Sequence, residues 1–85
     1  MDVYKVSIKR DAEKDLSDLS KNDLRKMTQK IQHLAKNPRP QGCEKLKGEE
    51  GYRIRQGDYR VVYLVDDQEK QVRIIRVGHR REVYR

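Results

Sequence analysis

Two hydrophobic periods alternate along the chain, and the changes between them mark its elements. Residues 3–8, VYKVSI, place successive side chains on alternate faces, which predicts a β-strand. Residues 10–19 and 24–35 carry apolar side chains three or four positions apart, as amphipathic helices do. After the irregular connector at 38–42 the period of two returns and predicts further strands at 43–47, 52–56, 59–65 and 71–77.

Capping and breaking residues separate these elements. Ser20 or Asn22 can cap the second helix, and Asn37-Pro38 ends it. Two helices joined by so short a break form an antiparallel hairpin. The sequence therefore predicts a single α+β domain over residues 1–85, in the order β-α-α-β-β-β-β, with a helical hairpin packed on one face of a mainly antiparallel sheet.

The composition narrows the choice of partners and compartment. Charged residues make up 41% of the chain, hydrophobic residues 34%, and the net charge is +7. Such a basic domain suits a polyanion or an acidic protein partner. A single cysteine, Cys43, excludes an internal disulfide and fits a reducing compartment. No run approaches the roughly 18 apolar residues of a membrane span, so we expect a cytoplasmic protein with no membrane partner.

Arginine is concentrated in the second half of the chain. Residues 1–42 hold three arginines and seven lysines, whereas residues 43–85 hold eight arginines and three lysines. Lysine is a general solubilising cation, but the planar guanidinium of arginine matches a phosphate with two parallel hydrogen bonds. We therefore expect the functional site in the second half.

The stretch YRIRQGDYRVVY, residues 52–63, brings three of these arginines to one hairpin. Gly57-Asp58 predicts a two-residue turn, and counting outward from it fixes the register. That register pairs Gln56 with Tyr59, Arg55 with Arg60, Ile54 with Val61, Arg53 with Val62 and Tyr52 with Tyr63. One face then collects the side chains that the helices should cover, namely Tyr52, Ile54, Tyr59, Val61, Tyr63 and Val65. The other face collects Arg53, Arg55 and Arg60, with Val62 and Leu64 beyond them.

Like charges that lie directly opposite each other destabilise a pair of strands. A sequence selected only for stability would not place Arg55 across from Arg60. We therefore predict that this face binds an anion, and a phosphodiester is the first candidate. The structural alternative is a solvated face whose charges are moderated by Asp58 or Glu44.

The C-terminal segment VGHRREVYR extends the predicted site. Gly78 allows a bend or a close approach of a ligand to the backbone. His79, as a histidine, could transfer a proton near neutral pH. Tyr84 could stack on a base or donate a hydrogen bond. A frayed basic tail is the alternative interpretation of this segment.

The order of elements, the block KLKG…YRIR…GDYRVVY and the ending VGHRREVY together resemble the RelE toxins of bacterial and archaeal toxin–antitoxin systems. The resemblance extends over essentially the whole chain. It implies an endoribonuclease that cleaves mRNA in the ribosomal A site, without a metal or cofactor, and that a RelB-like antitoxin, expected to be acidic, holds inactive. The implied reaction is attack of the ribose 2′-OH on the adjacent phosphate, which leaves a 2′,3′-cyclic phosphate and a free 5′-OH.

The resemblance also implies a role for each matching residue. Arg53 and Arg55 match two basic strand residues, one of which is proposed as general base in relatives. Because arginine, with a pKa above about 12, is a poor base, Arg53 is expected to act as an electrostatic clamp. Arg60 matches the arginine that holds the scissile phosphate. Arg80 matches a proposed acid or transition-state stabiliser, and Tyr84 a residue that stacks on mRNA. The other basic residues expected to hold RNA are Lys45, Lys47, Arg76, Arg81 and Arg85.

The proton-transfer residues and the cellular target of the protein each have an alternative interpretation. Some relatives use a glutamate and a histidine as the proton-transfer pair, which Glu44 and His79 could form here, but Glu44 could equally neutralise a basic neighbour. A ParE-like toxin would share the fold and act on DNA gyrase without the nuclease residues. A non-catalytic RNA-binding module would share the basic face and cleave nothing.

Overall fold

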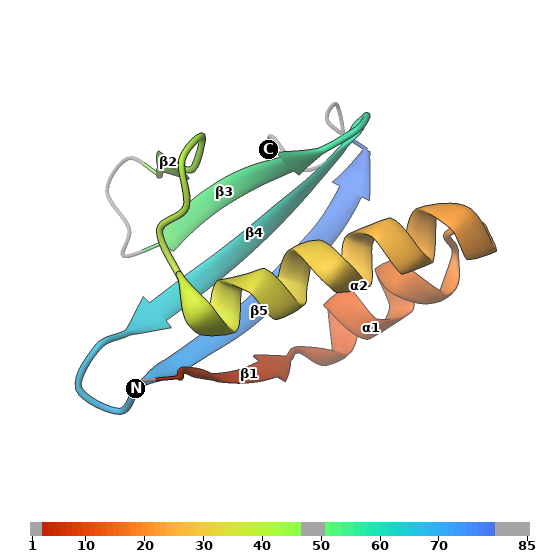
Figure 1. Ribbon diagram of the computed structural model, residues 1–85. Helices are drawn as coiled ribbons and strands as arrows, with labels where there is room; N and C mark the ends of the chain where they lie inside the picture. Colours follow the sequence, from red (N-terminus) through yellow and green to blue (C-terminus); the bar gives the residue numbers. More distant parts are fainter. Residues whose placement is uncertain (1–2, 47–50, 80–85) are drawn as a thin grey trace.

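Two helices cover one face of a five-stranded sheet (Figure 1), as the α+β prediction requires. This computed structural model describes residues 3–46 and 51–79. The elements, in chain order, are β1 (Lys5–Ile8), α1 (Arg10–Ser17), α2 (Lys21–Lys36), β2 (Glu44–Lys45), β3 (Gly51–Gln56), β4 (Tyr59–Asp66) and β5 (Gln71–His79).

The strands lie in the order β1-β5-β4-β3-β2. β1 runs parallel to β5, and every other neighbouring pair is antiparallel. The first strand of the chain therefore pairs with the last, and the helices form the first connection between strands. This pairing leaves β3, β4 and the far end of β5 as one continuous surface on the face that the helices do not cover.

The start of α2 follows the predicted capping signal. Ser20 is the N-cap, and its hydroxyl oxygen accepts a hydrogen bond from the backbone N–H of Asp23 at 3.2 Å. Asp23 in the first turn and Lys36 in the last turn complement the helix dipole. α1 ends at Ser17, two residues earlier than the periodicity predicts, because the chain must turn before it reaches the Ser20 cap.

The core fills the space between the helices and the covered face of the sheet. The predicted face of the hairpin supplies Ile54, Val61 and Tyr63, each at most 2% exposed. Leu24 was also predicted to face the core, but it is 37% exposed because the buried part of α2 begins only at Met27. The other buried core residues are Ala12, Ile31, Leu34, Val72, Ile74 and Val77.

A register shift between β4 and β5 was not predicted. Val62 pairs with Arg76, but the next residue of β4, Tyr63, pairs with Ile74. One residue of β5 is thus inserted, which is a β-bulge. Because side chains alternate along a strand, the insertion moves Arg76 away from the core face that strict alternation would have given it and places Val77 there instead.

Asp15 of α1 protects the edge of β5 beyond the end of β1. β1 stops at Ile8, opposite Ile74. Further along β5, the backbone N–H of Val77 donates to Asp15 Oδ2 at 2.9 Å, and Arg76 Nε donates to the same oxygen at 2.8 Å. The carboxylate of a helix therefore satisfies an edge that would otherwise invite pairing with another chain.

Candidate functional site

The predicted register of the β3–β4 hairpin is confirmed at all five pairs, including Arg55 opposite Arg60. Gly57 takes a φ of +61° in the turn, a left-handed conformation that favours glycine. The residues of β3 and β4 that alternate with the buried core residues share the face away from the helices, which we call the open face. Arg53, Arg55 and Arg60 lie on it, as predicted.

Cross-strand pairing arranges the open face in parallel rows of side chains. The first row consists of Arg55, Arg60 and Gly78. Because Gly78 has no side chain, β5 contributes nothing that rises beside Arg60 in this row. The next row consists of Glu44, Arg53, Val62 and Arg76, and the third of Gly51, Leu64 and Arg73.

The three arginines of the open face have different surroundings. Arg53 Nη2 lies 3.2 Å from Glu44 Oε2, and the Arg53 side chain is only 13% exposed. Arg55 is exposed. Arg60 is 4% exposed and is the only charged residue that is buried within the described part of the chain.

The burial of Arg60 gives the first row a fixed cationic centre. A buried charge is costly and persists only where the surrounding structure holds it. Because a guanidinium keeps its proton in proteins, Arg60 supplies a positive charge at any physiological pH. Its neighbours in the row are the exposed cation of Arg55 and Gly78, which has no side chain. An anion bound here would meet one rigid donor and one adaptable donor.

Glu44 and His79 do not come together, so the structure does not form the suggested proton-transfer pair. Glu44 contacts Arg53 on the open face. His79 pairs with Tyr59, and their rings meet edge to face with centroids 6.0 Å apart. Tyr59 shares the helix-covered face with Val61, so His79 lies across the sheet from Glu44. For Glu44, the observed contact is the neutralisation of a basic neighbour.

The remaining predicted site residues fall into two groups. Arg76 donates to both carboxylate oxygens of Asp15, at 2.8 and 3.3 Å, at the edge of the sheet. Lys45 is exposed in β2 and pairs with Tyr52, so it points to the opposite side from Glu44. The other predicted residues, Lys47, Arg80, Arg81, Tyr84 and Arg85, lie outside the described residues.

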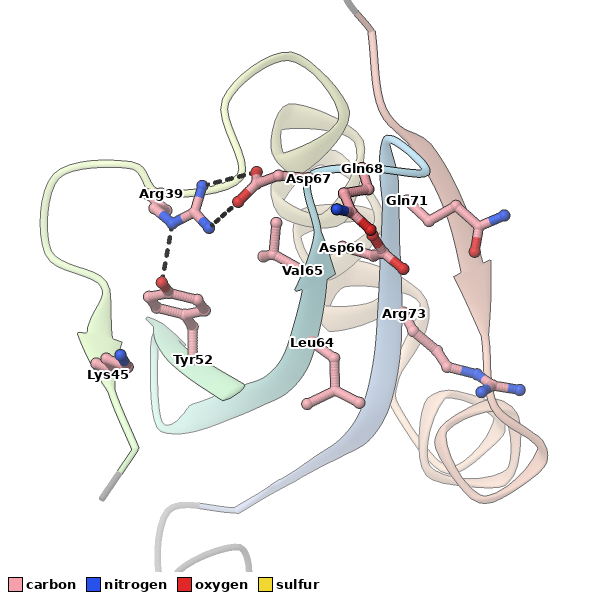
Figure 2. A pocket seen from close by; sticks show the side chains of 10 residues that line it. All are labelled: Arg39, Lys45, Tyr52, Leu64, Val65, Asp66, Asp67, Gln68, Gln71 and Arg73. Atoms are coloured by element: carbon pink, nitrogen blue, oxygen red, sulfur yellow. Dashed lines mark hydrogen bonds and ion pairs between the residues drawn. The ribbon is translucent and has the colours of Figure 1, made fainter. Parts of the chain in front are cut away.

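A hollow of about 640 Å³ lies at the other end of the sheet, around the end of β4 (Figure 2). Its lining includes Leu64, which is 37% exposed. Cationic side chains border it, and amide side chains come from the β4–β5 connection and the start of β5. The alternation of β4 predicted that Leu64 lies on the face of the three arginines, but no sequence pattern indicated the hollow. The full lining is Arg39, Lys45, Tyr52, Leu64, Val65, Asp66, Asp67, Gln68, Gln71 and Arg73.

A polar cluster fixes the rim of this hollow (Figure 2). Arg39 donates two hydrogen bonds to the Asp67 carboxylate, at 2.8 and 3.2 Å, and one from Nε to the Tyr52 hydroxyl at 2.9 Å. The Tyr4 hydroxyl also donates to Asp67, at 2.6 Å. These hydrogen bonds lower the pKa of Asp67 from 3.8 to about 2, and those from Arg39 have the largest effect. The cluster joins segments that are far apart in the sequence, so no local pattern announces it.

Tyr63 anchors the connector beneath the same cluster. Its hydroxyl donates to the Pro38 carbonyl at 2.7 Å in a buried position. Burial raises the pKa of Tyr63, so its hydroxyl stays protonated as the donor. The Tyr63 ring stacks on Tyr52 at a centroid distance of 5.8 Å. The connector and the end of β4 therefore form one fixed unit.

Residues 3–46 and 51–79 contain no helix that is long and apolar enough to cross a membrane. They also contain no group of three histidine, cysteine or acidic side chains that could hold a metal ion.

Residues 6–84 match the family described as the ParE toxin of the type II toxin–antitoxin system parDE. A protein of Methanocaldococcus jannaschii with the provisional name toxin RelE1 is 34% identical over 86 residues, which cover 96% of each chain. The chain belongs to the RelE/ParE superfamily of type II toxins. The resemblance read from the sequence motifs is thereby confirmed at the level of the superfamily.

Solved structures of RelE proteins share the fold of this RelE/ParE toxin over nearly its whole length. A chain of the archaeal RelE–RelB complex from Pyrococcus horikoshii matches with a TM-score of 0.84 and 31% identity, covering 94% of this chain and 98% of that one. The isolated RelE toxin of E. coli matches with a TM-score of 0.79 and 30% identity, covering 95% and 90%. A chain of the RelBE2 complex of Mycobacterium tuberculosis gives a TM-score of 0.81 at 30% identity, covering 92% and 99%.

Proposed function

We propose that this toxin is an endoribonuclease that cleaves mRNA in the ribosomal A site and so stops translation. The observation that carries the proposal is the first row of the open face, in which the buried Arg60 lies between the exposed Arg55 and Gly78. A buried, fixed cation beside an exposed one, next to a residue without a side chain, suits the phosphodiester of a single RNA strand. The likeness to RelE proteins in sequence and fold supports the same assignment.

In the proposed reaction the ribose 2′-oxygen forms a bond to the adjacent phosphorus while the bond from phosphorus to the 5′-oxygen breaks. The products are a 2′,3′-cyclic phosphate and a 5′-hydroxyl, and one proton moves from the attacking to the leaving oxygen. Negative charge grows on the phosphoryl oxygens in the transition state. Arg60 and Arg55 would stabilise that charge, whereas Arg53 is directed by Glu44 and would act as a clamp on the neighbouring backbone.

Proton transfer then falls to few side chains. His79 lies on the covered face, opposite the arginines. Glu44 is on the open face but is engaged with Arg53. The sequence resemblance assigns an acid or stabilising role to Arg80 and a stacking role to Tyr84. Because a guanidinium keeps its proton, we assign to Arg80 the stabilisation of charge in the transition state and not the transfer of a proton.

A protein with this activity requires an inhibitor in its own cell. RelE relatives occur in complexes with RelB antitoxins in Pyrococcus horikoshii, Mycobacterium tuberculosis and E. coli. By the same logic we propose a co-expressed RelB-like antitoxin for this toxin. Its +7 net charge favours an acidic partner, and association should slow as salt increases.

Primer extension on mRNA bound to translating ribosomes tests the proposed activity. We expect breaks within the A-site codon when the toxin is added, fewer breaks when ribosomes are omitted, and none with Arg60→Ala. Ribosome-bound mRNA that stays intact at full toxin concentration would contradict nuclease activity and leave an RNA-binding module.

The family description favours one further candidate. The matching family is that of ParE toxins, and a ParE-like protein would act on DNA gyrase. Inhibition of gyrase supercoiling by this toxin, in the absence of mRNA cleavage, would select that function. The arginine row favours the nuclease, because a fixed cation beside an exposed one suits a phosphodiester.

A further inference from the structure

The hollow at the end of β4 takes no part in the proposed reaction, yet it continues the surface on which that reaction would occur. Leu64 lies four residues beyond Arg60 on the same strand and the same face, which is about 13 Å along the sheet. Val62 lies between them in the middle row. An extended strand of RNA that binds at Arg60 and follows β4 would reach the hollow.

Leu64 presents an apolar surface in the hollow, although most of the lining residues are polar. Leu64 is 37% exposed, and its row neighbour Gly51 has no side chain to cover it. A Cβ at position 51 would lie 3.3 Å from Leu64 Cδ2 and 3.2 Å from Leu46 Cδ1, so glycine lets Leu46 and Leu64 approach each other. An exposed apolar surface of this kind can take the face of an unstacked base.

The rim of the hollow carries both charge and hydrogen-bonding groups. Arg73 is exposed and is the row neighbour of Leu64 on the open face, where it could hold a phosphate beside the base. Arg39 is already used by Asp67. On the open face, Asp66 keeps one carboxylate oxygen on the backbone N–H of Glu69 at 3.0 Å, which leaves its second oxygen to accept from a ligand.

We propose that this hollow is a second RNA subsite, which holds an unstacked base on Leu64 and a flanking phosphate on Arg73. The proposal rests on the proposed nuclease function and specifies its substrate. The carboxylate of Asp66 accepts hydrogen bonds and repels phosphate, so the subsite favours a base with an exocyclic amino group, such as cytosine, over uracil. The cationic rim favours RNA over an apolar peptide.

Binding of 2′-O-methylated oligonucleotides, which cannot be cleaved by 2′-OH attack, tests the subsite. Fluorescence anisotropy at low salt would compare a dinucleotide, which is too short to reach Leu64 from the Arg60 row, with an octanucleotide that reaches the hollow. We expect Leu64→Ser to weaken octanucleotide binding roughly tenfold, near the low end of base-stacking contributions, and to leave dinucleotide binding unchanged. Leu24→Ser is the matched control, because Leu24 is also 37% exposed but lies on α2.

Base preference gives a second readout. The wild-type toxin should bind octacytidine more tightly than octauridine, and Asp66→Asn should abolish or reverse that preference, since asparagine keeps the turn hydrogen bond but can present a donor to the base. Arg73→Ala should weaken binding of both sequences and flatten its salt dependence.

Three outcomes would overturn the subsite. The first is equal octanucleotide affinity for Leu64→Ser and wild type, and the second is equal loss for both oligonucleotide lengths. The third is a loss of binding only to an acidic antitoxin peptide, which would assign the hollow to the protein partner. The nuclease proposal is judged separately, because ribosomal cleavage that requires Arg60 can persist while the subsite fails.

Discussion

Arg39 and Arg55 lie toward opposite ends of the sheet and have opposite electrostatic surroundings. Arg39 donates to Asp67 and Tyr52 and so joins the connector to β3 and to the β4–β5 turn. Arg55 lies directly across from Arg60, a pairing of like charges that weakens the hairpin. Arg39 stabilises the fold, whereas Arg55 does not. The contrast supports the proposal that the open face binds a ligand, whereas the hydrogen bonds between Arg39 and Asp67 serve stability.

Removing the buried cation should produce the largest change. We expect Arg60→Ala to lower the rate of mRNA cleavage on ribosomes about 100- to 1000-fold, as the loss of a fixed transition-state donor does. Circular dichroism should show that the domain remains folded. Arg25→Ala, on the exposed surface of α2, is the control and should cleave at the wild-type rate. Near-normal cleavage by Arg60→Ala would remove the basis of the anion site.

The buried hydroxyl of Tyr63 tests how much the Asp67 end of the sheet contributes to stability. Tyr63→Phe removes the hydrogen bond to the Pro38 carbonyl and should lower the free energy of unfolding by about 1 kcal/mol. Urea unfolding measures this change, and Tyr59→Phe on the same strand is the control. Cleavage by Tyr63→Phe should stay near wild type. A Tyr63→Phe protein that is fully stable but inactive would move the functional site to this end.

The role of Glu44 can be tested with Glu44→Gln. If its carboxylate only neutralises Arg53, the cleavage rate should change by no more than a few fold and the shape of the pH–rate profile should persist. Stability should change little, because Glu44 is half exposed and solvent screens the pair. Loss of one limb of the pH–rate profile in Glu44→Gln would instead identify Glu44 as a proton-transfer group.

Acid should weaken the stabilised end through Asp67. Its pKa is lowered from 3.8 to about 2 in the folded protein, chiefly by Arg39, so its contribution to stability is present above about pH 4 and is lost as the pH falls toward 2. Asp67→Asn should be less stable than wild type at pH 7 and should lose less stability between pH 4 and 2. Asp58→Asn, in the hairpin turn, should follow the wild-type curve.

The hairpin was predictable residue by residue because its turn is local. Gly57-Asp58 sets the register, and strict alternation then assigns Arg53, Arg55 and Arg60 to one face. The order of elements was predictable from the two hydrophobic periods, which are also local features of the sequence. These features depend on neighbours in the sequence, and each was confirmed in the structure.

What escaped prediction depends on contacts between distant segments. The bulge in β5 was hidden because Ile74 and Ile75 are both apolar, so either could have faced the core. The side of the sheet taken by His79 depends on the β4–β5 register, which the long turn between those strands leaves undetermined. The bonds from Arg39 to Asp67 join residues that are 28 positions apart. The burial of Arg60 depends on how other segments pack around it, which the sequence of β4 alone does not indicate.

The most direct test of the contrast between the two ends is the rate of ribosomal mRNA cleavage by Arg55→Gln beside that by Arg39→Gln. Both variants remove one exposed positive charge and keep a long polar side chain. Arg55→Gln should cleave at least about tenfold more slowly, because it loses a charged phosphate contact, while its hairpin becomes no less stable. Arg39→Gln should unfold at lower urea concentration but cleave at the wild-type rate while folded. Equal losses of cleavage in the two variants, or a larger loss in Arg39→Gln, would contradict the assignment of the open face as the catalytic surface.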